Sequence, residues 1–228
     1  MTHQVDLFWS FRSPYSYLVT PPLIALERDW DANVNVRPVL PIAVRQPDFF
    51  ANADPLWASY LMRDCKRSAE FAGLPLRWPR PDPVVMDFAT RTYPKEQPHI
   101  HRLTRLGQLA AERGFGLSLL RRVSHLIWSG ETDNWHEGDH LALAVAAAGG
   151  DLAELDAVIA AEADRLDAAI NQNEADQRLG GHYGVPLMVY EGEPFFGQDR
   201  YDQLLWRMQG HGLMARGQVS AWASTGSA

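Results

Sequence analysis

The chain has 228 residues, of which 46% are apolar and 21% are charged, and its formal net charge at pH 7 is −7. This length suffices for one large domain or for a domain with an insertion, and the acidic balance offers no basic excess for binding nucleic acid or an anionic membrane. The single cysteine, Cys65, excludes an intrachain disulfide, so the cysteine content gives secretion no support.

The first residues lack the charged region and the apolar core of a signal peptide, and no apolar run approaches ~18 residues. We therefore expect a cytoplasmic protein without a membrane span. Residues 5–9 are apolar and aromatic, which predicts a short buried strand. Ser13-Pro14 then predicts a helix start, because serine caps helices well and a proline in the first turn gives up no needed N–H.

The first helix is expected over residues 15–29, with Pro21 and Pro22 kinking it or restarting it. Residues 33–39 alternate in polarity like a second strand, so the chain opens as a parallel strand–helix–strand unit. From about residue 48 to residue 180 helical patterns dominate, interrupted by glycines and by a proline-rich loop. The helices expected there cover residues 55–72, 99–113, 117–128, 140–148 and 152–173, and the loop covers residues 79–83.

Strand patterns return near the C-terminal end of the chain. Residues 187–190 and 193–196 are expected to form a hairpin around a Glu191-Gly192 turn. A last helix is expected over residues 199–208. From Gln209 onward, small and polar residues predict a frayed tail.

Three short segments attract attention because of where they stand. Ser13-Pro14-Tyr15-Ser16 opens a helix directly after a strand, Gly184-Val185-Pro186 precedes the late strand, and residues 195–200 lead from the hairpin into the last helix. Each has an ordinary explanation when taken alone: a helix cap, a trans proline at a strand start, and a helix cap by Asp199.

Together and in this order, these segments resemble the DsbA-like branch of the thioredoxin superfamily, and within it the 2-hydroxychromene-2-carboxylate isomerases and the related kappa-class glutathione transferases. The resemblance extends almost to residue 208. It is carried by Ser13-Pro14-Tyr15-Ser16-Tyr17-Leu18, Tyr60-x-x-x-Asp64-x-x-Arg67 with Gly73-Leu74-Pro75, Gly184-Val185-Pro186 and Phe196-Gly197-Gln198-Asp199-Arg200.

The resemblance implies an α/β, thioredoxin-like fold with a large all-helical insertion. Residues 1–47 and 179–228 would form the discontinuous thioredoxin-like domain, and residues 48–178 would form the inserted helical domain. In that fold Pro186 lies before a strand and opposite Ser13, so we predict that the Val185–Pro186 bond is cis. Relatives commonly form dimers, which implies a homodimer.

The resemblance also implies a chemistry. Redox relatives carry cysteines at the positions of Ser13 and Ser16, and two hydroxyls cannot cycle between dithiol and disulfide. A helix N-terminus still stabilises a thiolate, so the site can work with a borrowed thiol, for which glutathione is the natural source. By resemblance, Ser13 would activate the glutathione sulfur, and the backbone of Val185 would pair with the cysteinyl part. Gln198 and Asp199 would hold the γ-glutamyl end.

One departure from the relatives concerns glutathione binding. Several of them carry a lysine that helps to hold glutathione where this chain has Trp57, and Asn52 is a candidate for a nearby polar contact. Tyr15, Trp57 and Phe196 are candidates for an apolar pocket, although each is explained equally well as core.

The resulting hypothesis is a glutathione-dependent cis–trans isomerase that acts in aromatic catabolism on a 2-hydroxychromene-2-carboxylate-type substrate by reversible thiol addition. Its alternatives are a kappa-like glutathione transferase, which shares the site but keeps the adduct, and a non-redox thioredoxin-fold binding protein.

A rival motif stands in the middle of the chain. His136-Glu137-Gly138-Asp139-His140 matches H-E-x-x-H, the zinc-peptidase signature, which needs a helix to bring both imidazoles to one face. Gly138 and Asp139 are poor helix formers, and Asp139 is better placed as the cap of the helix that follows. We therefore expect no bound metal at these histidines.

Overall fold

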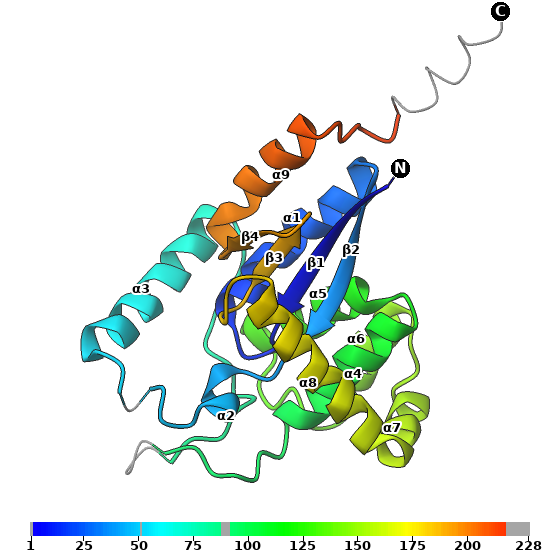
Figure 1. Ribbon diagram of the computed structural model, residues 1–228. Helices are drawn as coiled ribbons and strands as arrows, with labels where there is room; N and C mark the ends of the chain where they lie inside the picture. Colours follow the sequence, from blue (N-terminus) through cyan, green and yellow to red (C-terminus); the bar gives the residue numbers. More distant parts are fainter. Residues whose placement is uncertain (1, 51, 88–91, 218–228) are drawn as a thin grey trace, which may run out of the picture.

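The computed structural model describes residues 2–50, 52–87 and 92–217 and is built around a four-stranded sheet in the order β2-β1-β3-β4 (Figure 1). β1 (His3–Trp9) and β2 (Ala32–Pro38) are parallel and are connected by α1 (Pro14–Asp29). β3 (Leu187–Tyr190) is antiparallel to β1 and forms a hairpin with β4 (Glu193–Phe196). The predicted strand–helix–strand opening and the late hairpin are therefore confirmed.

In α1, burial of side chains in the core outweighs the low helix propensity of two prolines. The alternative of a restart after Thr20 is wrong, because one helix runs without a break from Pro14 to Asp29, and the kink at Pro21 and Pro22 stays a prediction. An interior proline costs about 3 kcal/mol of helix stability. Val19 and Leu23, on either side of the pair, are fully buried in the core, and this burial offsets the lost hydrogen bonds.

The first helix between β2 and β3, a single turn over residues 42–45, was not predicted, and most of the others fall close to the predicted positions. In chain order these helices are α2 (Ile42–Arg45), α3 (Pro55–Phe71), α4 (Ile100–Glu112), α5 (Gly116–Trp128), α6 (His140–Ala148), α7 (Leu152–Ala161) and α8 (Ala163–Leu179). The single helix expected over 152–173 is wrong: it breaks at Glu162, and α8 continues to Leu179. α7 packs against α6 and α4 whereas α8 packs against α4 and β2, so the chain must turn between them.

The chain ends in a short 3-10 turn, η1 (Gln198–Arg200), and in α9 (Tyr201–Gly210). The frayed tail expected from Gln209 is wrong for the residues just after α9, because Leu213 is buried and the Arg216 N–H donates to the Asp29 carbonyl at 2.9 Å. Residues 218–228 of that predicted tail lie outside the described residues.

One hydrophobic cluster joins the sheet to the helices that follow β2. It contains Leu7 of β1, Val36 of β2, Leu103 of α4 and Trp128 of α5. Figure 1 shows α4 to α8 grouped together in green and yellow. The division into residues 1–47 with 179–228 and an inserted domain of 48–178 stays a prediction. None of the helices in the described part of the chain has the length and apolar character that crossing a membrane requires.

Candidate functional site

Ser13 caps α1 from the turn after β1 and reaches across to the segment before β3. Its backbone is extended, and its Oγ accepts a hydrogen bond from the Ser16 N–H at 3.2 Å. The same hydroxyl donates to the Val185 carbonyl at 3.4 Å, which is long for such a bond. The hydroxyl is therefore a helix cap, and a weak second bond joins it to Val185.

Val185 and Pro186 form a backbone edge next to Ser13. The Val185–Pro186 peptide bond is cis, as predicted. Among the described residues, no group accepts a hydrogen bond from the Val185 N–H, and the Val185 carbonyl has the long contact with Ser13. An extended peptide can therefore pair with both backbone groups of Val185.

Gln198 and Asp199 lie in η1, which is tied to the cis proline. The Gly197 N–H donates to the Pro186 carbonyl at 2.9 Å, and Gly197 has the positive φ of 102° that the turn requires. The Gln198 amide contacts Ser68 of α3 at 3.4 Å, and the exposed Asp199 carboxylate pairs with Arg200 at 3.0 Å. Asp199 makes no helix-capping hydrogen bond, so its interpretation as a simple cap is wrong.

A chain of aromatic rings, which we call the aromatic chain, leads from the segment before α4, past the loop after α2, to β4. Neighbouring ring centres are 3.8–6.3 Å apart in the order Tyr93, Phe50, Trp57, Phe49, Tyr183, His182, Phe196. A cavity of about 460 Å³ opens beside it, lined by Gln46, Pro47, Asp48, Phe49, Asn52 and Ala53. Trp57 and Phe196 thus belong to one chain of rings, and Asn52 lies on the cavity wall.

Tyr15 is directed elsewhere. Its hydroxyl donates to the Asp64 carboxylate of α3 at 2.7 Å, and Tyr60 and Arg67 bind the same carboxylate. Burial, together with the bond to Asp64, raises the pKa of Tyr15 far above its usual value. Burial alone would raise the pKa of Asp64, but these three donors hold it below its usual value. Tyr15 therefore holds α3 to α1 as a neutral donor, and its part in the pocket stays a prediction.

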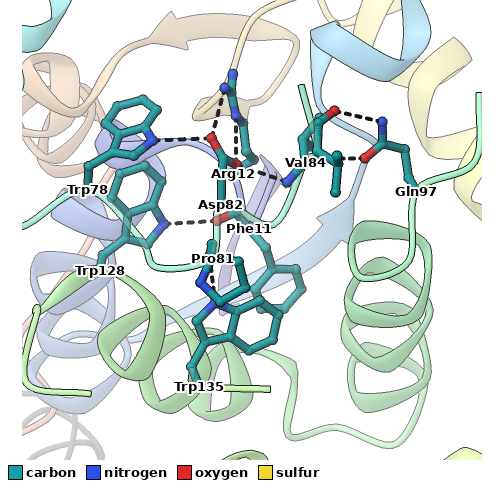
Figure 2. A network of polar contacts seen from close by, with 10 residues as sticks. Phe11, Arg12, Trp78, Pro81, Asp82, Val84, Gln97, Trp128 and Trp135 are labelled. Carbon is teal, nitrogen blue, oxygen red and sulfur yellow. Dashed lines mark hydrogen bonds and ion pairs between the residues drawn. The ribbon is translucent and has the colours of Figure 1, made fainter. Parts of the chain in front are cut away.

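Arg12, the residue before Ser13, forms an ion pair that sequence reasoning missed (Figure 2). Its Nε and Nη2 donate to the two oxygens of Asp82 at 3.2 and 3.1 Å. The same carboxylate accepts from the Trp78 indole at 3.2 Å and from the Val84 N–H at 2.9 Å. The guanidinium carbon also lies within 6.0 Å of the rings of Phe50, Trp78 and Tyr93.

The loop that carries Asp82 is anchored on both sides of this pair (Figure 2). Trp135 donates from its indole N–H to the Pro81 carbonyl at 2.8 Å, and Gln97 binds both the N–H and the carbonyl of Val85. Trp128 donates to the Phe11 carbonyl at 2.9 Å. The turn that presents Ser13 is therefore held in place by side chains that are far apart in the sequence. Their contacts follow no local spacing, so the sequence pattern does not predict them.

His136 and His140 do not share a helix, as predicted, because α6 begins at His140. Asp139 occupies the cap position but makes no side-chain capping bond. The His136 ring lies 4.7 Å from that of His99. Within residues 2–50, 52–87 and 92–217, no three metal-ligating side chains gather into a possible metal site. The expectation that no metal binds here stays a prediction.

His182 adds a titratable group to the segment before Pro186. Its Nδ1 accepts a hydrogen bond from the Gly184 N–H at 2.8 Å, and its ring stacks on Phe196. Burial lowers the pKa of His182, so the neutral ring is favoured in the folded protein.

This lowered pKa predicts an acid-dependent loss of stability. Because the unfolded chain has the higher histidine pKa, ~6.5, the stabilisation is complete above that pH and is lost as the pH falls below it. We expect the unfolding free energy of the wild type minus that of His182→Phe to decrease as the pH falls from about 7 to about 5 in urea titrations. Other histidines cancel in this difference, and a difference that does not change with pH would contradict the assignment.

Comparisons with known proteins agree with this architecture. A family model described as a DSBA-like thioredoxin domain matches residues 4–209. No curated protein matches the sequence. A structure of 2-hydroxychromene-2-carboxylate isomerase is 21% identical with a TM-score of 0.64, and the match covers 90% of this chain and 94% of that chain.

Two further solved structures share the fold. A probable DsbA oxidoreductase from Streptomyces coelicolor is 20% identical with a TM-score of 0.63, over 91% of this chain and 90% of that chain. The cytosolic disulfide reductase DsbM from Pseudomonas aeruginosa with GSH is 16% identical with a TM-score of 0.56, over 90% and 98%. The predicted thioredoxin-like fold with a helical insertion is confirmed.

Proposed function

Because this chain belongs to the DSBA-like thioredoxin domain family, we propose that it is a glutathione-dependent isomerase of an aromatic, 2-hydroxychromene-2-carboxylate-type substrate. The observation that carries the proposal is the Ser13 hydroxyl at the N-terminus of α1, 3.4 Å from the carbonyl that precedes cis Pro186. Ser16, one turn further, is a second hydroxyl where a redox protein needs its second thiol.

The chain's own thiol does not replace those hydroxyls. Cys65 lies in α3 and is 1% exposed. Burial raises the pKa of this thiol, which disfavours the reactive thiolate. Disulfide reduction, the activity named for the similar structure of DsbM, therefore finds no thiol pair in this chain.

The residues around Ser13 fit glutathione. The Val185 N–H lacks a partner among the described residues, and this edge suits the backbone of a cysteinyl residue. The exposed Asp199–Arg200 pair offers one charge for the α-amino group and one for the α-carboxylate of the γ-glutamyl end, with the Gln198 amide beside it. Asn52, on the cavity wall, offers an amide to the glycyl end where Trp57 replaces the lysine of relatives.

The chemistry of Ser13 follows from its two hydrogen bonds. When a bound peptide N–H takes the Val185 carbonyl, the Ser13 hydroxyl proton is freed to turn toward a sulfur at the helix N-terminus. That N-terminus contributes roughly half a positive charge, and a hydroxyl donor adds a charge-assisted hydrogen bond. Bound glutathione would supply a nucleophilic sulfur for reversible addition to a carbon conjugated with a carbonyl, which permits rotation about the former double bond.

Product analysis tests the proposal. With a conjugated aromatic substrate, we expect the isomer to accumulate while the glutathione concentration stays constant. Stoichiometric consumption of glutathione with formation of a conjugate would instead establish the transferase. Glutathione binding without turnover would establish the binding protein.

The aromatic chain and its cavity support an aromatic substrate, and Trp57 tests this. We expect Trp57→Ala to raise the KM for the aromatic substrate about tenfold, because it removes one ring of the aromatic chain beside the cavity, and to leave glutathione affinity unchanged. Steady-state kinetics with each substrate varied in turn measure both. The matched control is Trp206→Ala, which removes an exposed indole from α9. Equal effects of the two variants on the KM would show that Trp57 does not contact the aromatic substrate.

A further inference from the structure

The buried face of α8 changes from apolar to amide as it approaches the site. Leu166, Ile170, Asn173 and Gln177 follow one another at the spacing of one helix face, and all four are buried. Leu166 belongs to the hydrophobic cluster. Burying an amide costs free energy unless each of its polar atoms has a hydrogen-bond partner. Asn173 and Gln177 therefore need such partners, which a leucine at the same position would not.

Gln177 binds the segment before Val185 with its amide nitrogen and binds Arg45 with its amide oxygen. Its Nε2 donates to the Gly184 carbonyl at 2.7 Å, and its Oε1 accepts from Arg45 Nη1 at 3.1 Å. Arg45 Nη2 donates in turn to the Tyr183 carbonyl at 3.0 Å. Two side chains from α2 and α8 therefore hold two successive carbonyls, directly before the residue whose backbone faces Ser13.

Burying the charged side chain of Arg45 at this place costs free energy. Its side chain is 7% exposed, and its nearest carboxylate, Glu174, lies 3.8 Å from its Nε. Burial lowers the pKa of Arg45 and raises that of Glu174. Apolar packing often stabilises as much as a buried ion pair does, so the pair with Glu174 is weak evidence for a stabilising role, whereas the hydrogen bonds of Arg45 to Gln177 and Tyr183 fix local geometry.

We propose that Arg45 and Gln177 are positioning residues that set the backbone of Val185 for a peptide-like ligand. The inference rests on the proposed glutathione site and deepens it. The segment from Gly180 to Pro186 forms turns rather than a strand, and Gly184 has intrinsic backbone freedom. Holding the carbonyls of Tyr183 and Gly184 removes that freedom before the ligand arrives, so less entropy is lost on binding.

Gln177→Glu tests this with little change in size. The variant keeps an oxygen for Arg45 but loses the donor to the Gly184 carbonyl and places a carboxylate against it. We expect the Kd for glutathione to rise about tenfold, with kcat at saturation within about twofold of the wild type. The pKa of the bound thiol should not move, because Ser13 and α1 are untouched.

The matched control is Asn173→Asp, the same chemical change on the same buried face. Asn173 donates to the Pro38 carbonyl at 3.0 Å and to the Gln108 amide at 2.8 Å, not to the segment before Val185. We expect it to lower stability as Gln177→Glu does, without weakening glutathione binding. Amide hydrogen exchange at residues 183–187 without ligand should accelerate in Gln177→Glu alone.

Two results would overturn the inference: wild-type glutathione affinity in Gln177→Glu, or an equal loss of affinity in Asn173→Asp. If the wild type binds no glutathione, the proposed function fails, and the exchange measurement decides the positioning role separately. Unchanged exchange at residues 183–187 in Gln177→Glu would then reject it.

Discussion

Ser13→Ala is expected to lower kcat for the isomerisation about 100-fold while changing glutathione affinity only a few-fold. Loss of one preorganised donor to a developing or bound anion typically costs 10²–10³ in rate. The affinity should survive because the proposed peptide contacts lie at Val185, Gln198 and Asp199. Steady-state kinetics at saturating glutathione and calorimetric titration of glutathione separate the two quantities.

Ser16→Ala is the matched control for that variant. Ser16 is completely buried, and its Oγ has no hydrogen-bond partner among the described residues. We expect its kcat to stay near the wild-type value. Ser13→Ala also removes the cap on the Ser16 N–H, worth about 1 kcal/mol, so unfolding must be measured beside activity. Equal kcat in the wild type and Ser13→Ala would reduce Ser13 to a helix cap.

Arg12→Met is expected to lower the free energy of unfolding by about 3 kcal/mol. Removing one partner of a largely buried ion pair leaves the other charge uncompensated, and such changes typically cost 3–5 kcal/mol. Asp82 would lose two of its four donors and keep those from Trp78 and Val84. Urea denaturation measures the loss.

Two further variants sharpen this test. Arg12→Met combined with Asp82→Asn removes the stranded charge, so we expect it to recover a large part of the loss. Arg28→Met breaks the exposed pair with Asp29 and should leave stability unchanged. The account of Arg12 is wrong if Arg12→Met and Arg28→Met unfold at the same urea concentration.

The strands, turns and helix starts that depend on short sequence patterns were predictable from the sequence. The alternation of residues 33–39 marks β2, and the Glu191-Gly192 turn marks the β3–β4 hairpin. Ser13-Pro14 marks the start of α1, and the order of the motifs places Val185 opposite Ser13. Each of these depends on residues adjacent in sequence or on one long-range pairing that the fold family implies.

The features that were missed depend on contacts between distant segments. Arg12 and Asp82 are 70 residues apart, and Arg45 meets Gln177 across 132 residues. A lone arginine or a buried glutamine has no spacing that reveals its partner. Phe49 and Tyr183 join the aromatic chain only because the loop after α2 folds against the segment before Pro186. Helix propensity likewise carries no information about the turn at Glu162.

Titration of the thiol in the wild-type glutathione complex tests the central claim most directly. If Ser13 and the N-terminus of α1 stabilise a thiolate, ultraviolet thiolate absorbance should titrate about 2 pKa units below that of free glutathione, which corresponds to about 2.7 kcal/mol. Ser13→Ala should move the curve back toward free glutathione, and Ser16→Ala should leave it in place. A wild-type complex that titrates like free glutathione would contradict the proposal that this site activates a borrowed thiol.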